Sequence, residues 1–303
     1  MWRLCLILLF WLAALPAAAQ DRYASIIVDA DTLDVLHARQ IDAERFPASL
    51  TKIMTLYVTF EAIERGEIAL DATVRVSAHA AATPPVKMGL RRGQDVRLDT
   101  LIQAVAVRSS NDAAVAIAEA VGGSEEAFVA RMNDAAKRLT MQRTTFRNPH
   151  GLPDAEQHST ARDMAKLAHA TLTRFPQHYH YFGQTEFRGR RNTNALLRSR
   201  EDVDGFKTGY TRASGYNLVI SATRDGRRLL AVVLGGASSG SRNTHMSDLI
   251  DRGWAVMDMT APIEPKPVRM AEAHAQPLAP QVFPVGHSSS PPIHWALQID
   301  GFD

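Results

Sequence analysis

A polar pair opens an apolar stretch in the sequence Phe46-Pro47-Ala48-Ser49-Leu50-Thr51-Lys52-Ile53-Met54-Thr55-Leu56-Tyr57. Apolar residues recur here at helical spacing, and Pro47 suits the turn before a helix, so the stretch predicts a helix over 49–65 with Ser49 in its first turn. Residues three apart lie on one helix face, so the hydroxyl of Ser49 can meet the amine of Lys52. A serine needs such a base to act as a nucleophile, and a lysine becomes one when burial or nearby cations lower its pKa. The alternative is a capping serine followed by a surface lysine.

A second polar motif, Ser109-Ser110-Asn111, stands in a short break between two apolar helical patterns, 98–107 and 113–120. A break of this kind can hold hydroxyl and amide groups in a cleft while the helices on either side support the backbone. The alternative is helix punctuation, with Ser110 or Asn111 capping the next helix.

The third motif, Lys207-Thr208-Gly209, lies in a predicted strand over 203–211. Its lysine offers a fixed cation and its threonine a hydroxyl, while a glycine lets a ligand lie close to the backbone. The set suits capture of a terminal carboxylate at a sheet edge. An edge lysine that discourages aggregation, followed by a bulge glycine, is the structural alternative.

The remaining patterns predict an antiparallel sheet and more helices. Two strands over 23–30 and 33–38 flank a tight turn, and two more over 215–223 and 229–234 are joined through Arg224-Asp225-Gly226-Arg227, a hairpin sequence. Helices are predicted over 124–139 and 161–173, the second opened by a capping box at Thr160-Ala161-Arg162-Asp163. His150 lies in a Pro/Gly-rich loop, where a local hydrogen-bonding role is expected.

Residues 1–19 are predicted to be an export signal. Arg3 precedes an apolar run of 12 residues, Leu4 to Leu15, and Ala17-Ala18-Ala19 offers a small-residue cleavage site. Because that run is short for a bilayer, we expect cleavage, no transmembrane span in the mature chain, and an exported protein of the periplasm or cell envelope. A retained amino-terminal anchor is the alternative.

Composition and spacing exclude several classes of protein. The chain has 303 residues, 46% apolar and 22% charged, an ordinary globular composition with room for one large domain or two modest ones. A net charge of +2 with scattered basic residues indicates no nucleic-acid partner. The single cysteine, Cys5, lies in the export segment, and the histidines lack zinc-hydrolase spacing, so we expect no metal site and no cofactor.

The three polar motifs occur together and in a fixed order, which chance would produce in roughly one such chain in a thousand. With this motif set, the chain resembles the serine D-alanyl-D-alanine carboxypeptidases, the low-molecular-mass penicillin-binding proteins of peptidase family S11, over about 24–258. The resemblance implies an α/β fold of three layers, with an antiparallel sheet, flanking helices and an all-helical lobe beside them. The active site would lie between the sheet and that lobe.

The resemblance also implies roles for individual residues. Three would be catalytic, as acylated nucleophile, base and proton shuttle respectively: Ser49, Lys52 and Ser109. Five would bind substrate: Asn111, Lys207, Thr208, Gly209 and Tyr210. Asn111 would hold the substrate amide, and Lys207 and Thr208 its terminal carboxylate. Gly209 would let the substrate lie close to the strand backbone. The oxyanion hole would use the backbone N–H groups of Ser49 and Tyr210. The substrate would be a peptidoglycan pentapeptide stem that loses its terminal D-Ala, and β-lactams would inhibit by trapping Ser49.

Two features depart from the family pattern. Some relatives have histidine where this chain has Tyr210, although that position acts through its backbone. After the predicted catalytic domain over 20–260, residues 261–293 form a Pro-rich linker, and 294–303 resemble the truncated start of a SPOR domain, a small peptidoglycan-binding module.

Three other functions remain open at this point. A class A β-lactamase shares the motifs but needs a deacylating glutamate, and no Glu-x-x-Leu-Asn run occurs between Asn111 and Lys207. A D,D-endopeptidase that cleaves cross-links shares every motif. A non-catalytic wall-binding protein would be free to lose Lys52 or Ser109, and both are present.

Overall fold

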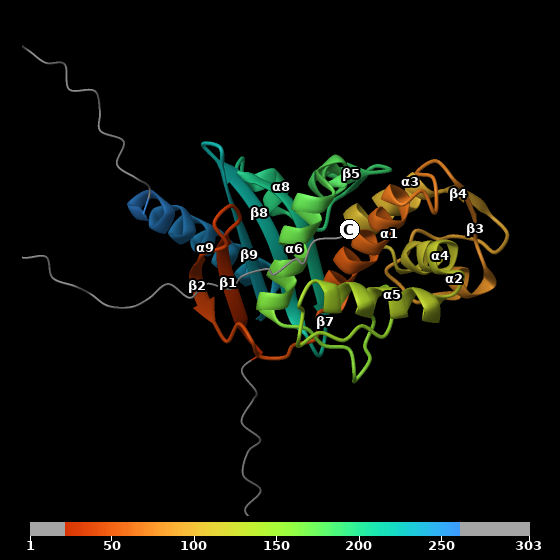
Figure 1. The fold of residues 1–303 in the computed structure, drawn as a ribbon, viewed down its shortest axis with the longest axis horizontal. Helices are drawn as coiled ribbons and strands as arrows, with labels where there is room; N and C mark the ends of the chain where they lie inside the picture. Colours follow the sequence, from red (N-terminus) through yellow and green to blue (C-terminus); the bar gives the residue numbers. More distant parts are fainter. Residues whose placement is uncertain (1–21, 261–303) are drawn as a thin grey trace, which may run out of the picture.

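The computed structural model describes residues 22–260, and these form a five-stranded antiparallel sheet with a helical lobe at one edge (Figure 1). The strand order is β2-β1-β9-β8-β7, so the first strand of the described chain lies beside the last. The strands are β1 (Ala24–Asp29), β2 (Val35–Arg39), β7 (Val203–Thr211), β8 (Gly215–Arg224) and β9 (Arg227–Gly236).

Local sequence explains the β8–β9 hairpin. Asp225 and Gly226 both adopt positive φ, 52° and 76°, between the paired residues Arg224 and Arg227. A two-residue turn with positive φ at both positions matches the twist of the strands it joins, which confirms the predicted hairpin.

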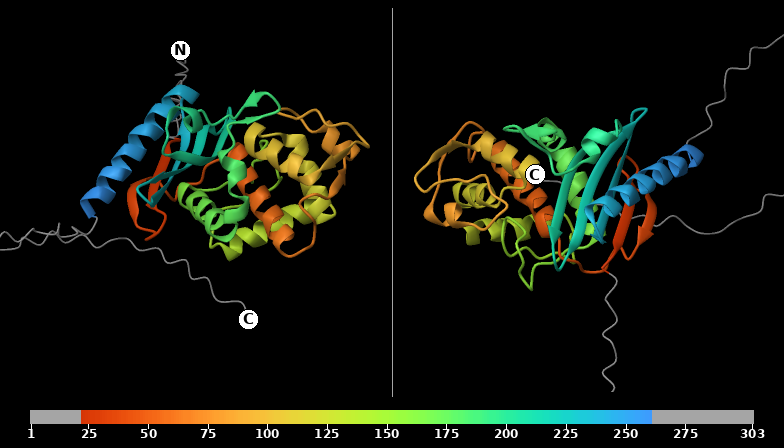
Figure 2. Two further views of the ribbon diagram at one scale, coloured as in Figure 1. Left: turned by 90° about the horizontal axis from the view of Figure 1, so that it is seen from above. Right: turned by 180° about the vertical axis from the view of Figure 1, so that it is seen from behind.

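Helices cover both faces of the sheet. The long helix α9 (Ser239–Thr260) packs on one face, and α6 (Ala161–Arg174) lies on the other (Figure 2). At Gly253 of α9 an added Cβ would lie 3.1 Å from side-chain atoms of both Ile27 and Leu229, so the glycine lets helix and sheet approach closely. The result is a three-layer α/β arrangement, as the sequence predicts.

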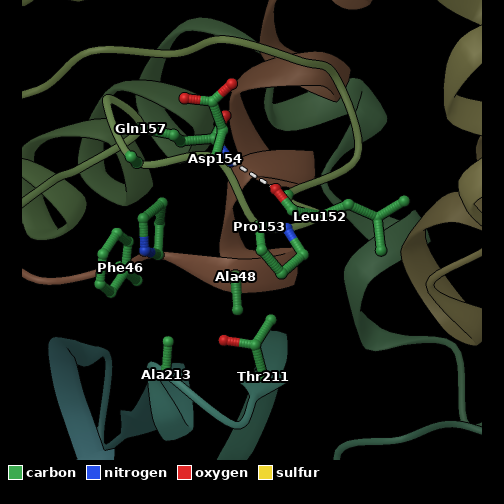
Figure 3. A pocket seen from close by; sticks show the side chains of 11 residues that line it. Phe46, Ala48, Leu152, Pro153, Asp154, Gln157, Thr211 and Ala213 are labelled. Carbon is green, nitrogen blue, oxygen red and sulfur yellow. Dashed lines mark hydrogen bonds between the residues drawn. The ribbon is translucent and has the colours of Figure 1, made fainter.

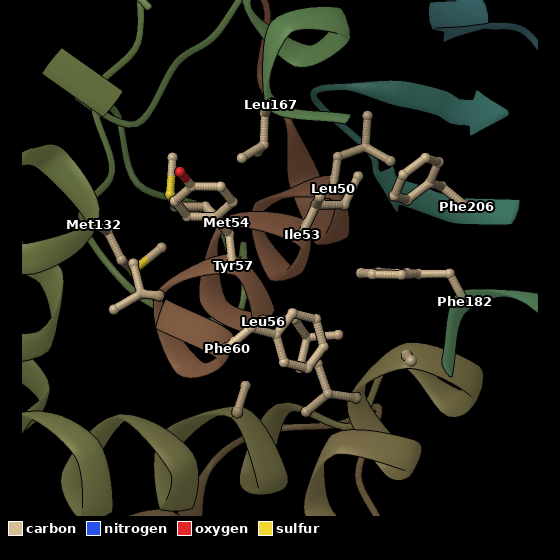
Figure 4. Packing of buried hydrophobic residues seen from close by; sticks show 14 of the residues in the cluster. Leu50, Ile53, Met54, Leu56, Tyr57, Phe60, Met132, Leu167, Phe182 and Phe206 are labelled. Atoms are coloured by element: carbon tan, nitrogen blue, oxygen red, sulfur yellow. The ribbon is translucent and has the colours of Figure 1, made fainter. Parts of the chain in front are cut away.

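The helical lobe is organised around α1 (Thr51–Glu64), which is buried from Thr51 to Ala62. Its side chains meet α5 (Glu125–Arg138) at Met132, α6 at Leu167 and the β7 strand at Phe206 (Figure 4). Other elements surround α1, which accounts for the burial of both its apolar and its polar residues. Around it lie α2 (Ala78–Ala82), α3 (Leu98–Arg108), α4 (Asn111–Gly122), α5 (Glu125–Arg138) and the hairpin of β3 (Thr73–Arg75) with β4 (Asp95–Arg97).

Two helix starts differ from the sequence-based prediction. Ser49 lies in a 3-10 turn, η1 (Ala48–Leu50), directly before α1 rather than within its first α-helical turn. The helix predicted over 113–120 begins at Asn111, with Ser110 at the N-cap position but without a side-chain capping bond. In contrast, the predicted cap of α6 is confirmed, because Thr160 accepts a hydrogen bond from the backbone of Asp163 at 3.1 Å.

Several short elements between α6 and β7 have no clear sequence pattern. They are η2 (Pro176–His178), α7 (His180–Gly183), α8 (Leu196–Ser199) and a hairpin of β5 (Glu186–Phe187) with β6 (Arg190–Arg191). The predicted export signal over 1–19, the linker over 261–293 and the SPOR-like start over 294–303 lie outside the described residues. Among residues 22–260, no helix is both long enough and apolar enough to span a bilayer.

Candidate active site

The turn that carries Ser49 is fixed by side chains and backbone from distant parts of the chain. Asn217 of β8 donates hydrogen bonds to the carbonyls of Phe46 and Pro47 at 2.9 and 3.1 Å. Gly151 has φ +82°, and an added Cβ there would lie 1.9 Å from the carbonyl oxygen of Ala48. Only glycine fits this approach, so the loop after His150 holds the turn from one side while β8 holds it from the other.

Lys52 is fully buried at the start of α1. Its Nζ lies 3.2 Å from Ser49 Oγ, 2.8 Å from Asn111 Oδ1 and 2.5 Å from the carbonyl oxygen of His150. Burial lowers the pKa of Lys52 well below its usual value, and the nearby charge of Lys207 lowers it further. A neutral amine has two N–H groups and one lone pair. The two oxygens of Asn111 and His150 accept the N–H groups, which leaves the lone pair for the hydroxyl hydrogen of Ser49.

The break between α3 and α4 presents the second motif. Ser109 adopts a left-handed conformation, φ 61°, and its Oγ is buried without a hydrogen-bond partner among residues 22–260. Asn111 is oriented by both ends of its amide, because its Oδ1 faces Lys52 while its Nδ2 donates to the carbonyl of Pro84 at 3.0 Å. Asp112 accepts bonds from the backbone of residues 88–90 and so anchors the loop that carries Pro84.

Lys207 lies on β7, the edge strand that faces the helical lobe, and is 1% exposed. Burial lowers its pKa to about 7, with further lowering by the positive charges of Arg242 and Arg108. Its Nζ donates to the carbonyl of Thr208 at 3.1 Å, and the Thr208 hydroxyl donates to that of Thr193 at 2.7 Å. No carboxylate neutralises Lys207 among the described residues. A buried cation held in this way favours an anionic ligand.

Gly209 brings β7 against the serine turn. An added Cβ would lie 3.0 Å from the carbonyl oxygen of Pro47 and 3.1 Å from the backbone nitrogen of Ser49. The next side chain, Tyr210, is 54% exposed and packs on Tyr216 with ring centroids 4.2 Å apart. The Tyr210 ring therefore lies at the surface, away from the buried lysines.

Sequence reasoning missed four residues that shape the site. Asn217 and Gly151 position the serine turn, Thr193 binds the hydroxyl of Thr208, and Arg242 lies close enough to Lys207 to lower its pKa. Their neighbours along the chain give no motif, although a glycine directly after Pro149-His150 indicates a turn with positive φ.

His150 contributes its backbone rather than its ring. Its carbonyl accepts from Lys52, while its Nδ1 accepts from the backbone N–H of Leu152 at 3.1 Å. Burial, followed by the charge of Lys52, lowers the pKa of His150 to about 3, so the ring is neutral at physiological pH. This arrangement fits the expected local hydrogen-bonding role.

A cavity of about 250 Å³ borders the serine turn at the Thr211 end of β7 (Figure 3). Its walls are mostly apolar and come from the segment before Ser49, the loop after Gly151 and the turn after β7. Figure 3 shows Phe46, Pro153 and Ala213 around the space.

Within residues 22–260, no group of three or more histidine, cysteine or acidic side chains is arranged to hold a metal ion.

Comparisons with known proteins identify the family that this chain resembles. The family model described as D-alanyl-D-alanine carboxypeptidase, peptidase family S11, matches residues 14–238. The D-alanyl-D-alanine carboxypeptidase DacC of Escherichia coli is 39% identical over 260 residues, which cover 82% of this chain and 65% of the relative. The chain spans 62% to 65% of the length of the first three curated relatives.

Solved structures give the same result. Penicillin binding protein 5 from Haemophilus influenzae superposes with a TM-score of 0.74 at 35% identity, covering 77% of this chain and 70% of that one. Penicillin-Binding Protein D2 from Listeria monocytogenes, in its cefotaxime-bound form, superposes with a TM-score of 0.69 at 27% identity, covering 76% and 96%. Motifs, fold and family model agree, and the chain belongs to the D-alanyl-D-alanine carboxypeptidase family, peptidase family S11.

Proposed function

We propose that this chain is a serine-type carboxypeptidase that removes the terminal D-Ala from peptidoglycan pentapeptide stems through an acyl-enzyme on Ser49. The observation that carries the proposal is the contact of 3.2 Å between Ser49 Oγ and the Nζ of a fully buried lysine whose pKa is lowered well below its usual value. A neutral amine in this position can take the hydroxyl proton as the serine attacks.

Acylation of Ser49 begins with the transfer of its hydroxyl proton. Lys52 accepts the proton of Ser49, and Ser49 Oγ forms a bond to the carbonyl carbon of the penultimate D-Ala. The backbone N–H groups of Ser49 and Tyr210 stabilise the oxyanion. The C–N bond breaks as the Ser109 hydroxyl, buried and free of other partners among the described residues, passes its proton to the leaving amine and takes up the proton that Lys52 holds. Lys52 is then neutral again. Water later attacks the ester while Lys52 takes its proton, and Lys52 returns that proton to Ser49 Oγ as the ester bond breaks.

Recognition of the substrate uses the edge strand. Lys207 and Thr208 bind the terminal carboxylate. Its negative charge pairs with the ammonium group of Lys207, which has no acidic partner among the described residues. Asn111 holds the substrate amide, and Gly209 lets the peptide lie against β7. The acyl part of the stem continues toward Thr211 and the apolar cavity beside the serine turn.

The proposal extends to inhibitors and location. Penicillins carry a carboxylate beside a strained amide. The carboxylate fits against Lys207 and Thr208, and the amide carbonyl lies at Ser49, which it acylates. The relative from Listeria monocytogenes was solved with cefotaxime bound.

Peptidoglycan lies outside the cytoplasmic membrane, and the export signal predicted over 1–19 delivers the enzyme to the periplasm or cell envelope.

A labelling experiment tests the nucleophile. Labelled penicillin should attach covalently to the wild type and not to Ser49→Ala, and the wild type should release D-Ala from a muramyl pentapeptide. Ser238→Ala, at an exposed serine before α9, is the matched control and should label normally. Labelling that persists in Ser49→Ala would remove Ser49 from the mechanism.

A further inference from the structure

A second cavity, of about 160 Å³, lies between the α3–α4 break and the β5–β6 hairpin. Its walls carry no carboxylate and four cationic side chains: Lys87, Arg108, Arg188 and Arg190. Within residues 22–260, none of these four cations is paired with an acidic side chain. Cations gathered in a cleft without counter-charges attract anionic ligands.

The cavity is close to the carboxylate end of the site. Arg108 lies near enough to Lys207 to lower its pKa, and its Nη1 donates to the carbonyl of Arg191, the last residue of the hairpin, at 2.5 Å. Two residues later, Thr193 contacts the hydroxyl of Thr208 at 2.7 Å. The hairpin therefore packs beside α3, and the segment that follows it reaches β7 at Thr208 rather than at the Thr211 end of the strand.

One wall also holds an unused hydrogen-bonding group. Ser110 is 1% exposed, and its Oγ has no partner among the described residues. It follows Ser109, the residue that serves the leaving amine in the proposed mechanism. The cavity thus combines positive charge with a buried hydroxyl on the side from which the leaving group departs.

We propose that this cavity is a subsite for the leaving residue, one that accepts a side chain carrying a second carboxylate. The inference rests on the proposed function, in which Lys207 and Thr208 hold the first carboxylate of that residue. With that carboxylate fixed and the acyl part directed toward Thr211, the side chain of the leaving residue lies beside the α3–α4 break. The bonds made and broken are unchanged, since the same C–N bond is cleaved and the amine takes the proton. Peptides whose leaving D-residue carries a side-chain carboxylate are then preferred substrates.

Matched peptides test the subsite. The kcat/KM values of one acyl-D-Ala donor would be compared with D-Glu, D-Gln and D-Ala as leaving residue. D-Glu and D-Gln have nearly the same shape and differ in charge, so we expect a preference of roughly fivefold for D-Glu that declines at high salt. In R188Q/R190Q, whose side chains are exposed, the preference should fall to about one.

Arg212→Gln removes one positive charge from an exposed position at the opposite end of β7 and should keep the preference. Penicillin labelling of each variant reports correct folding. An unchanged ratio of D-Glu to D-Gln in R188Q/R190Q, or no preference in the wild type, would overturn the subsite. In either case, release of D-Ala from the D-Ala-D-Ala peptide would leave the carboxypeptidase function standing. Failure to release D-Ala at all would reject both.

Discussion

At the scale of single residues, the site contains two buried lysines whose pKa values are both lowered, and we assign them different tasks. Burial, followed by the charge of Lys207, lowers the pKa of Lys52 well below its usual value, as a general base requires. Burial lowers the pKa of Lys207 to about 7, and a bound carboxylate would favour its charged form.

Replacing Lys52 by arginine tests its role as the base. Arginine remains charged in proteins and has no lone pair to accept the Ser49 proton, so penicillin acylation should slow by about a thousandfold. The rate constant of acylation, followed with labelled penicillin, measures the effect. Lys137→Arg at an exposed position is the control and should acylate at the wild-type rate. Equal acylation rates in Lys52→Arg and wild type would show that another group accepts the proton.

The anchor role of Lys207 predicts a coupled loss. Amidating the terminal carboxylate should lower kcat/KM by about a hundredfold, because it removes a charge-assisted bond and leaves a buried cation unpaired. Lys207→Ala should cost a similar factor on the acid substrate and little more on the amide, since both changes remove one interaction. The measurement is the cycle of two enzymes and two substrates. Additive losses would assign Lys207 to a different task.

The lowered pKa of Lys207 gives this interaction a pH dependence. Only the charged lysine attracts the carboxylate, and its charge is lost as the pH rises through about 7 in the free enzyme. The kcat/KM for the acid substrate should therefore fall above pH 7, whereas the amide substrate should lack this decline. Lys52 acts in the opposite sense, because it works when neutral and loses activity as the pH falls through its own lowered pKa. A decline of equal size for both substrates would contradict the assignment.

At the scale of elements, the serine turn is set by contacts that only tight backbone approach allows. Gly151 lies against Ala48 with φ +82°, whereas Gly66 has φ +68° with nothing within 4 Å of an added Cβ. The two glycines share a backbone conformation and differ in their surroundings. Comparing them separates backbone strain from the clash.

Gly151→Ala should lower the free energy of unfolding by about 3 kcal/mol or more and slow penicillin acylation, since the turn has to shift. Gly66→Ala should cost about 1 kcal/mol from backbone strain alone and leave acylation unchanged. Denaturant unfolding and acylation rates measure both effects. Similar losses in the two variants would mean that the contact with Ala48 does not hold the turn.

At the scale of the whole molecule, the buried apolar residues form two clusters on opposite faces of the sheet. The larger cluster joins the helical lobe to one face, and the smaller one lies between α9 and the other face. Trp254 anchors α9 in the smaller cluster. It is 1% exposed, its Nε1 donates to Asp202 at 2.9 Å, and the guanidinium of Arg224 lies over its ring. Ser49, Lys52 and Lys207 lie outside this cluster.

Trp254→Ala should therefore reduce the free energy of unfolding by about 3–5 kcal/mol while the folded enzyme keeps its acylation rate. Trp254→Phe, which loses mainly the bond to Asp202, should cost about 1–2 kcal/mol. Urea unfolding followed by tryptophan-independent circular dichroism, with acylation measured well below the midpoint, tests the separation. A matching loss of acylation in folded Trp254→Ala would show that α9 also controls the site.

The sequence by itself determined the features that depend on near neighbours along the chain. The spacing of Ser49 and Lys52, the break at Ser109, the cap of α6 at Thr160 and the hairpin turn at Asp225 all act over a few residues. The strand pattern was sufficient to predict an antiparallel sheet. The order of the motifs was sufficient to recognise the family, and that resemblance implied the three-layer fold. These features are local because turn, cap and helix-face geometry follow from backbone conformation.

Only the tertiary structure decided how those residues are surrounded. The lowered pKa of Lys52 results from burial and from the charge of Lys207, which lies far away in sequence. That of Lys207 results from burial, followed by the charges of Arg242 and Arg108. The pairing of β1 with β9, the first helical position of Asn111 and the small elements between α6 and β7 likewise follow from packing. Desolvation and long-range contacts exist only after the chain has folded, so no local pattern specifies them.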